Sequence, residues 1–472
     1  MGEMQVPDEA LWGASTQRAV LNFPISGRPM PAAFVRGLGL VKLAAARANE
    51  HLGRLPAWKT RLIQQIAREI ADGQHMNQFP VDVFQTGSGT STNTNLNEVI
   101  VGRAAQLAGS PSLHANDDVN LGQSSNDVIP TALHLSVALS LHRDLAPALA
   151  ALAAALEIKS TEFAGIVKIG RTHLMDATPL TLGQEFSGYA MQARKAGERV
   201  QRAIAVLGEL AVGGTAIGTG LNTHPEFAGR VCRILSEETG LPFREARNHF
   251  EAQAARDDCV EVAGQLAAIA ASLTKIANDI RLLSSGPRAG LAELRLPATQ
   301  PGSSIMPGKV NPVMSEMLVQ VGLYVHGLTQ TVTACGRDGQ LELNATLPLI
   351  AHCLHESVHC LANGTRVFTE KCVVAIEADG ARCSALMRNS LMLVTALTPH
   401  LGYDVAASVA KEASASGKSL REVVLARGLM NAAAVDRALE PLAMTRPALP
   451  AFEAATPAEK TGGARTDLSR AD

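Results

Sequence analysis

The sequence predicts an all-α protein organised around a bundle of long helices. Between Asp127 and about Gly286, apolar residues recur at helical spacing with few breaks. Alanine and glycine occupy many flanking positions, which favours close packing on more than one side. Seven aliphatic residues in this stretch alternate at intervals of four and three positions: Val262, Leu266, Ile269, Leu273, Ile276, Ile280 and Leu283. Such a heptad seam is typical of a helix that packs nearly parallel or antiparallel to other helices.

Length and composition indicate a globular, cytoplasmic protein. A chain of 472 residues, 46% of them hydrophobic, can bury a substantial core and hold about two to four domains. The formal net charge of −2 provides no basic surface for nucleic acid or an acidic membrane. Seven cysteines, an odd number without a C-x-x-C pair, favour reduced thiols. Glu3 and Asp8 interrupt any signal-like run, and no apolar run approaches the ~20 residues of a membrane helix.

Breaks in the helical pattern predict three domains and a tail. Residues 1–125 are interrupted by Pro, Gly and Asn and indicate short helices joined by loops. Residues 126–380 form the predicted helical-bundle domain. The helices shorten again in a small C-terminal domain at 381–444. From 445 to 472, Pro, Ala and Thr with scattered charges predict a disordered tail.

The stretch Gly302–Asn311, which reads Gly-Ser-Ser-Ile-Met-Pro-Gly-Lys-Val-Asn, combines several groups that attract anions. Its two glycines and its proline exclude a continuous helix, so its serines lie on a mobile loop. Lys309 adds a positive charge, and Asn311 stands where an N-cap belongs, before Pro312 at the first helical position. That helix would point unpaired backbone N–H groups toward the loop. The stretch therefore predicts an anion site, although an ordinary capped loop-to-helix junction explains the same spacing.

Two polar stretches nearer the N-terminus could also face an anion. Thr86–Asn93 is rich in hydroxyl residues and glycine, as a phosphate-cradling loop would be, but it lacks the Gly-Lys-Ser/Thr ending of a P-loop. A plain polar turn is the alternative. Gln123–Asp127 is typical of an N-cap cluster, with Pro130 expected in the first turn of the helix. Capping alone is sufficient to explain this second stretch.

His173 follows Thr172 in a third polar stretch. A helix is expected to start near Pro179, which would make this segment another anion-facing helix N-terminus. A histidine in such a place is more commonly a capping or core residue than a catalyst. The residues alone leave both interpretations open.

Two further patterns suggest cofactors but have simpler explanations. Gly213–Gly220 superficially suggests dinucleotide binding, yet no βαβ pattern is expected around it, so a Rossmann site is rejected. His355 and His359 have the i, i+4 spacing that can hold zinc. A polar helix face is the favoured interpretation of that pair.

The Gly302–Asn311 stretch resembles the signature of the fumarase/aspartase superfamily, which eliminates a group β to a carboxylate to leave fumarate. The similarity runs from Leu11-Trp12-Gly13-Ala14 to about Gly428 and includes a Gly-Arg-Thr-His motif that ends at His173. Within the superfamily the chain is most similar to the class II fumarases. The resemblance implies a three-domain fold with five long helices per chain and a twenty-helix core in a homotetramer. It also implies reversible hydration of fumarate to L-malate, by anti addition and elimination through an aci-carboxylate, without metal or cofactor.

The resemblance also implies roles for individual residues. Ser303 is expected to be the base, and His173, held by Glu316, is expected to protonate the departing hydroxide through a water. The residues expected to bind the dicarboxylate are Ser88, Thr90, Asn93, Ser124, Ser125, Asn126, Thr172, Lys309 and Asn311. The residues expected at a secondary anion site are His114, Asn116 and Asp117. Loops from three chains would build each site, so the tetramer would be required for activity.

Two alternative functions remain open. An aspartate ammonia-lyase would use the same loop and base. Ser88 and Ser125 favour a fumarase, because aspartases tend to have Ala and Thr there, whereas Gly339–Asn344 and the stretch from Gly417 are closer to aspartases. The other alternative is a structural or binding descendant of the fold. Five residues that the reaction would need argue against it: Ser303, Lys309, Asn311, Thr172 and His173.

Overall fold

The heptad seam forms the buried stripe of one helix, α10 (Asp257–Leu283). The structure is a computed structural model that describes residues 2–109 and 113–447. In it, all seven seam residues are at most 5% exposed. Burying one such aliphatic side chain contributes about 1.5–3 kcal/mol, so the seam is a main source of stability for this helix. The predicted seam is confirmed.

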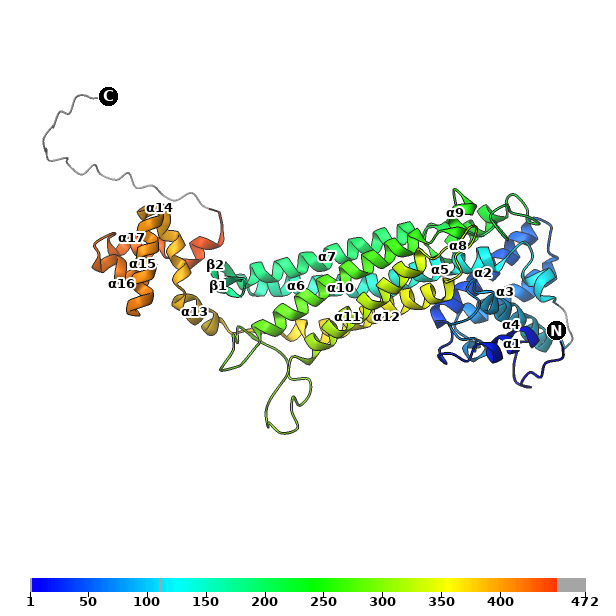
Figure 1. Cartoon of the computed structure of the whole chain (residues 1–472), viewed down its shortest axis with the longest axis horizontal. Helices are drawn as coiled ribbons and strands as arrows, with labels where there is room; N and C mark the ends of the chain where they lie inside the picture. The colour runs from blue at the N-terminus through cyan, green and yellow to red at the C-terminus, as the bar shows by residue number, and fades with distance from the viewer. Residues whose placement is uncertain (1, 110–112, 448–472) are drawn as a thin grey trace, which may run out of the picture. The chain divides into compact units, whose positions relative to one another are not determined.

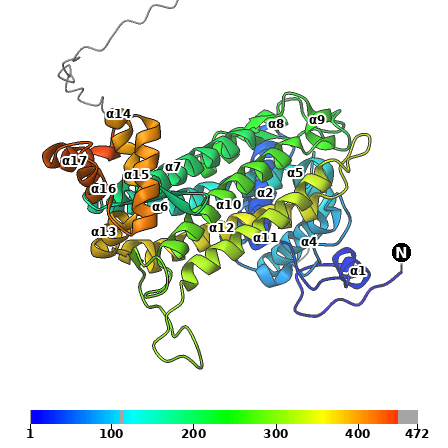
Figure 2. The same ribbon diagram turned by 60° about the vertical axis from the view of Figure 1, so that its left-hand side comes forward.

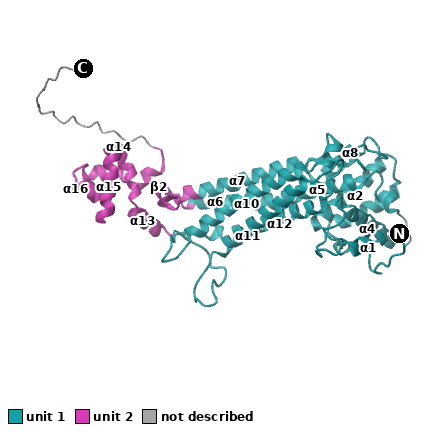
Figure 3. Cartoon of the chain, in the orientation of Figure 1, with its two compact units in different colours: residues 1–161, 186–378 teal, residues 162–185, 379–472 magenta. Residues whose placement is uncertain are grey.

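Contacts divide the chain into two compact units, shown in different colours in Figure 3. Unit 1 comprises residues 1–161 and 186–378, and unit 2 comprises residues 162–185 and 379–472. The predicted C-terminal domain at 381–444 falls within unit 2. The division into three domains stays a prediction.

Among the described residues, five long helical stretches run side by side (Figures 1 and 2), as the resemblance implied. They are α5 (Ser125–Ser140), continued by the π-helical turn η3 (Leu141–Leu145) into α6 (Ala146–Glu162), then α7 (Leu182–Val206), α10, α11 (Val313–Gly336) and α12 (Leu347–Lys371). In unit 1, α10 packs on α11, α11 on α12, and α12 on α5. The Tyr189 hydroxyl donates to Asp279 Oδ2 (3.0 Å) and ties α7 to α10. The predicted all-α class with a central bundle is confirmed.

Shorter elements complete unit 1. Its helices are α1 (Ala14–Asn22), α2 (Ala32–His51), α3 (Ala57–Ala71), η1 (Met76–Gln78), α4 (Thr90–Ala108), η2 (Ala115–Val119), α8 (Phe227–Thr239), α9 (His249–Ala254) and η4 (Val373–Ala375). Its two-residue strands are β3 (Glu209–Leu210), parallel to β4 (Arg244–Glu245), and β5 (Leu294–Arg295), antiparallel to β6 (Glu377–Ala378). The Glu98 carboxylate of α4 accepts the backbone N–H groups of Gly13, Ser15 and Thr16, and so caps the start of α1.

Two helical stretches pass a length and composition test for crossing a membrane: Ser125–Glu162 and Asp257–Leu283. The sequence expectation was that no apolar run approaches the ~20 residues that a membrane helix needs. Both stretches belong to the bundle, and the core helix of a soluble protein passes the same test. In each, 44% of the apolar window is buried within one chain.

Unit 2 combines a hairpin with short helices. The strands β1 (Val167–Thr172) and β2 (Met175–Thr181) pair antiparallel. The helices are α13 (Gly380–Asn389), η5 (Leu391–Leu397), α14 (Thr398–Leu401), α15 (Tyr403–Ser416), α16 (Leu420–Ala426), α17 (Ala432–Ala438) and η6 (Pro441–Thr445). Their core contains Leu393, Leu397, Val409, Ala413, Leu420, Val423, Val424 and Val435.

The predicted tail at 445–472 lies almost wholly outside the described residues. Thr445 itself ends the helix η6, and its carbonyl accepts a hydrogen bond from Gln184 Nε2 (2.7 Å). Thr445, the first residue of the predicted tail, therefore belongs to the helical part of unit 2.

Candidate active site

The first predicted substrate loop ends at the N-terminus of α4. Gly89 has a φ of 71°, which glycine adopts without strain, and this residue starts the helix at Thr90. The hydroxyls of Ser88 and Thr90 are hydrogen bonded to each other (2.7 Å). Asn93 Nδ2 donates to Asn120 Oδ1 (3.1 Å), while its buried Oδ1 has no partner among the described residues. The loop therefore places two hydroxyls and one amide around the N-terminus of a helix.

The second predicted substrate segment caps α5. Ser124 Oγ accepts the N–H of Asn126 (3.2 Å), and Asp127 Oδ1 accepts the N–H of Ser124 (2.9 Å), which completes a capping box. The capping interpretation is confirmed. Pro130, however, is the sixth residue of the helix, not a first-turn residue. Asn126 Nδ2 donates to the carbonyl of Ala216 (2.8 Å), which joins this segment to the Gly-rich stretch 213–220.

Asp127 holds that Gly-rich stretch through hydrogen bonds to its backbone. Its buried Oδ2 accepts the backbone N–H groups of Gly213 and Thr215 (both 3.0 Å). The expectation that no βαβ pattern surrounds the stretch was wrong. The strands β3 and β4, of two residues each, pair in parallel, and α8 lies between them in sequence. Two amides that could cradle a phosphate are nevertheless occupied by a carboxylate. These two N–H groups are therefore not free to bind a phosphate, and this supports the rejection of a dinucleotide site.

A buried polar network that the sequence reasoning missed contacts both predicted substrate segments. Lys42 of α2 is 0% exposed and donates to Asn120 Oδ1 (2.9 Å) and Gln123 Oε1 (3.0 Å). Burial lowers the pKa of Lys42 to about 7, against the attraction of Asp127. Burial also raises the pKa of Asp127 to about 6, although three backbone N–H groups and Lys42 oppose the shift. The sequence feature that could have indicated this network is a single lysine inside the apolar run Leu38–Ala46.

A cavity of about 870 Å³ in unit 1 brings together part of the substrate set and part of the secondary anion site. Ser124 and Ser125 line it, as do Asn116 and Asp117. Arg54, in the segment between α2 and α3, also lines it and was not predicted. His114 does not line it, and its Nδ1 accepts the N–H of Asp117 (3.1 Å) at the start of η2.

Thr172 and His173 lie in a different setting from the one predicted. They sit at the tip of the β1–β2 hairpin in unit 2, and the next helix starts only at Leu182. His173 and Leu174 have φ values of 56° and 64°, which suit the two-residue turns that connect twisted strands. The prediction of a helix N-terminus was therefore wrong. The Thr172 and His173 side chains are exposed on an ordered turn.

The Gly302–Asn311 loop is closed at its neck. Gly302 N–H donates to the Lys309 carbonyl (2.8 Å), and Asn311 Nδ2 donates to the Gly302 carbonyl (2.7 Å). The Asn311 side chain therefore joins the two ends of the loop, and the predicted N-cap role was wrong. Pro312 occupies the N-cap position, and α11 begins at Val313.

Ser303 is surrounded by backbone donors of its own loop. Its Oγ accepts the N–H groups of Ile305 (3.2 Å) and Met306 (3.1 Å). Two amides directed at one oxygen favour negative charge on it. Lys309 is exposed on the same loop, and Glu316 follows in the first turn of α11.

Within unit 1, the Ser303 loop and the Ser88 loop lie at opposite ends of α11 (Figure 1). The Ser303 loop precedes Val313, while the carbonyl of Gly87 accepts the N–H of Leu347 (3.0 Å), just beyond the far end of the helix. Because α11 has 24 residues, about 36 Å of helix separates the two loops. One copy of unit 1 therefore does not bring Ser303 to Ser88.

The two histidines with zinc-like spacing have unrelated partners. His355 is buried, and its Nε2 is hydrogen bonded to Ser136 Oγ (2.8 Å) of α5. Burial lowers the pKa of His355 to about 4. His359 is exposed and contacts Asn363. The polar-face interpretation therefore describes His359, whereas His355 is part of the core.

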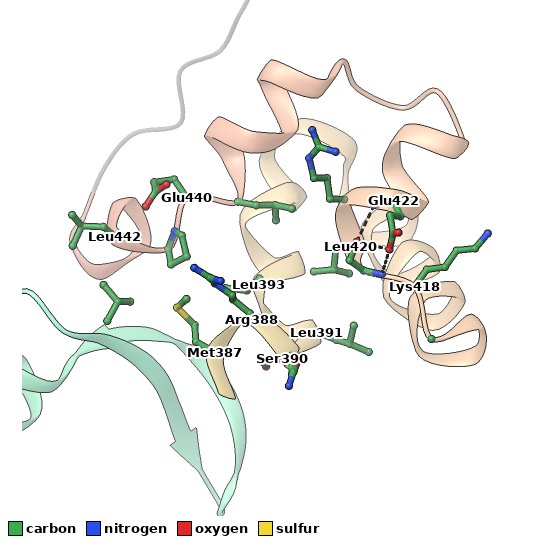
Figure 4. A pocket seen from close by; sticks show the side chains of 17 residues that line it. Met387, Arg388, Ser390, Leu391, Leu393, Lys418, Leu420, Glu422, Glu440 and Leu442 are labelled. Atoms are coloured by element: carbon green, nitrogen blue, oxygen red, sulfur yellow. Dashed lines mark hydrogen bonds between the residues drawn. The ribbon is translucent and has the colours of Figure 1, made fainter. Parts of the chain in front are cut away.

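Unit 2 holds a cavity of about 700 Å³ between α13, the start of α16 and η6. Figure 4 shows Arg388, Leu393 and Leu442 around it, and the Ser419–Glu422 capping box at its edge. None of the predicted site residues lines this cavity.

The bundle, the Ser303 loop and the two predicted substrate segments at helix N-termini agree with the expected lyase of the fumarase/aspartase superfamily, and the comparisons with known proteins show that class. A family model described as "Lyase" matches residues 2–327. A second, described as "Fumarase C C-terminus", matches residues 393–446.

Curated relatives make the assignment more specific. The chain is 52% identical to a class II fumarate hydratase of Halobacterium salinarum, covering 94% of this chain and 96% of that one. It is 48% identical to class II fumarate hydratase 1 of Pseudomonas aeruginosa, covering 93% and 96%. The crystal structure of a class II fumarase from Schistosoma mansoni superposes with a TM-score of 0.92 at 41% identity, covering 94% and 97%. The chain belongs to the class II fumarate hydratases, which are lyases.

Proposed function

We propose that this chain interconverts fumarate and L-malate, with Ser303 as the base that removes the C3 proton of malate. The carbanion places a second negative charge on the neighbouring carboxylate, so the site must stabilise an aci-carboxylate. The observation that carries the proposal is the pair of N–H groups, from Ile305 and Met306, that face Ser303 Oγ. They would stabilise the serine alkoxide once loop closure excludes water. Lys309 would supply the cation for the substrate carboxylate.

His173 would act on the other face of the substrate. It would protonate the departing hydroxide through a water, with Glu316 holding the imidazole. Ser88, Thr90 and Asn93 would bind one end of the dicarboxylate together with the capped segment Ser124–Asn126. Thr172 and Asn311 complete the proposed binding set.

The site would be assembled from several copies of the chain in a soluble, cytoplasmic homotetramer. The ~36 Å of α11 between the Ser303 and Ser88 loops supports this assembly, because one chain leaves the two halves apart. Exposed apolar side chains on the bundle helices, including Leu282, Leu323 and Tyr324, support it as well. A core of twenty helices, five from each copy, would bury them. His114, Asn116 and Asp117 would form a secondary anion site beside it.

We expect turnover of L-malate and fumarate with little or no release of ammonia from L-aspartate. Ser88, Ser125 and His173 motivate this choice, because aspartases tend to have Ala and Thr at the first two of these positions. The measurement is fumarate absorbance with each substrate at equal enzyme concentration. Ammonia release at a rate comparable to malate dehydration would reassign the chain to the aspartate ammonia-lyases.

Activity is also expected to survive removal of divalent metal. Across the described ranges 2–109 and 113–447, no three His, Cys, Asp or Glu side chains are grouped to hold a metal ion. The measurement is malate dehydration before and after dialysis against a chelator. Loss of activity that returns with one added divalent metal would contradict the proposed mechanism and reopen the question of His355 and His359.

A further inference from the structure

Lys42 is a buried charge that is hydrogen bonded to Gln123 of the second predicted substrate segment and to Asn120, which in turn contacts Asn93 of the first. It lies in the middle of α2, which packs on α3, α5 and α8. Removing an ammonium from water is costly unless its donors are satisfied by well-placed acceptors. Asn120 Oδ1 and Gln123 Oε1 provide those acceptors, at 2.9 and 3.0 Å. A buried lysine with such specific partners needs a reason beyond core packing.

Asn120 connects this lysine to the first substrate loop. Its Oδ1 accepts from Lys42 and also from Asn93 Nδ2 (3.1 Å), with a longer contact from Asn97 Nδ2 (3.4 Å). Its own Nδ2 donates to the carbonyl of Gln123 (3.0 Å), the residue before the α5 cap. One side chain thus touches α4 and the segment that leads into α5.

The donor pattern fixes the orientation of two side-chain amides. A protonated lysine offers only N–H donors, so the oxygen of Asn120 must face Lys42. That oxygen in turn requires the nitrogen of Asn93, which leaves Asn93 Oδ1 as a buried acceptor with no partner among the described residues. If Asn120 were free to rotate, Asn93 could present either end of its amide. Lys42, which donates to the oxygen of Asn120, and the Gln123 carbonyl, which accepts from its nitrogen, together remove that ambiguity.

We propose that Lys42 is a positioning residue for the dicarboxylate site, which it serves without touching substrate. It locks Asn120, and through Asn120 it sets the amide of Asn93 and the placement of the Gln123–Ser125 segment. The inference rests on the proposed function, because the ligand that these segments hold is the dicarboxylate. It adds a residue from α2 to a site otherwise built from loops and helix N-termini.

The test is a comparison of KM and kcat for L-malate in Lys42→Met, which keeps the length of the side chain and removes its donors. Positioning of ground-state binding groups acts mainly on KM. Loss of hydrogen bonds to a charged group predicts a rise in KM of about 10–100-fold, with kcat within a few-fold of wild type. The matched control is Lys159→Met, since Lys159 is a buried lysine of α6 outside both segments. Its KM should equal that of the wild type.

Two variants of Asn120 test the inference without removing the buried charge. In Asn120→Asp the side chain still accepts from Lys42 and Asn93 but no longer donates to the Gln123 carbonyl, so KM should rise less than in Lys42→Met. In Asn120→Leu all of these bonds are lost, and KM should rise at least as much as in Lys42→Met. These variants decide the question if Lys42→Met does not fold. Equal KM values in all folded variants, with an active wild type, would overturn the role of Lys42 alone. An inactive wild type would instead refute the proposed function.

Discussion

Ser303→Ala is expected to lower kcat for malate dehydration by at least ~10²–10⁴-fold, the range typical of a general acid or base. The side chain acts only in the transition state, so KM should change little. The fold should survive, because Ser303 Oγ bonds only to N–H groups of its own exposed loop. The measurement is steady-state kinetics with the mutant freed of wild-type enzyme.

Exchange of the malate C3 proton with solvent deuterium separates the base from the acid. Ser303→Ala should abolish exchange, whereas His173→Asn should keep exchange while turnover falls to near zero. Lys309→Ala should affect both kcat and KM, because its charge acts on the ground-state carboxylate as well as on the aci-carboxylate. Wild-type exchange in Ser303→Ala together with none in His173→Asn would reverse the two roles.

Mixing inactive Ser303→Ala with inactive His173→Asn should restore activity. If the two side chains reach a site from different copies, random reassembly leaves about a quarter of sites with both intact. Activity should therefore rise from near zero to a substantial fraction of wild type. The subunits should be exchanged under mild denaturation and assayed after refolding.

The matched control for this mixture is Ser303→Ala with Lys309→Ala. Both residues lie on the Gly302–Asn311 loop of one chain, so no reassembly can restore an intact loop. Light scattering on active enzyme should give about four times the chain mass of 49.5 kDa. A monomer that turns over malate would show that the site is complete in one copy.

The bundle is the part of the fold that the sequence predicted best. Helical periodicity is a local property, and the seam from Val262 to Leu283 is long enough to exclude a strand. All seven of its side chains are buried in α10 as predicted. Local capping chemistry was equally readable at Ser124, where an N-cap hydroxyl and an acidic N3 residue stand three positions apart.

Local turns were harder to predict. The Thr172–His173 segment was expected to precede a helix, but it is the tip of a hairpin whose turn lacks the Asn-Gly or Asp-Gly pair that usually announces one. Asn311 has the composition of an N-cap, yet its side chain clasps the carbonyl of Gly302, nine residues earlier. Both errors arose where the partner that decides the conformation lies outside the local window.

The sequence by itself determined the helical class, the heptad seam and the α5 cap, and it supplied the candidate site residues. Only the tertiary structure decided which of those residues lie close together in space. It set the Ser303 and Ser88 loops at opposite ends of α11, and it placed Lys42 and Asp127 beneath the substrate segments. The physical reason is that periodicity and capping depend on neighbours within a few positions. The Lys42–Asn120 and Asp127–Gly213 bonds instead join residues 78 and 86 positions apart, and their partners are chosen by packing.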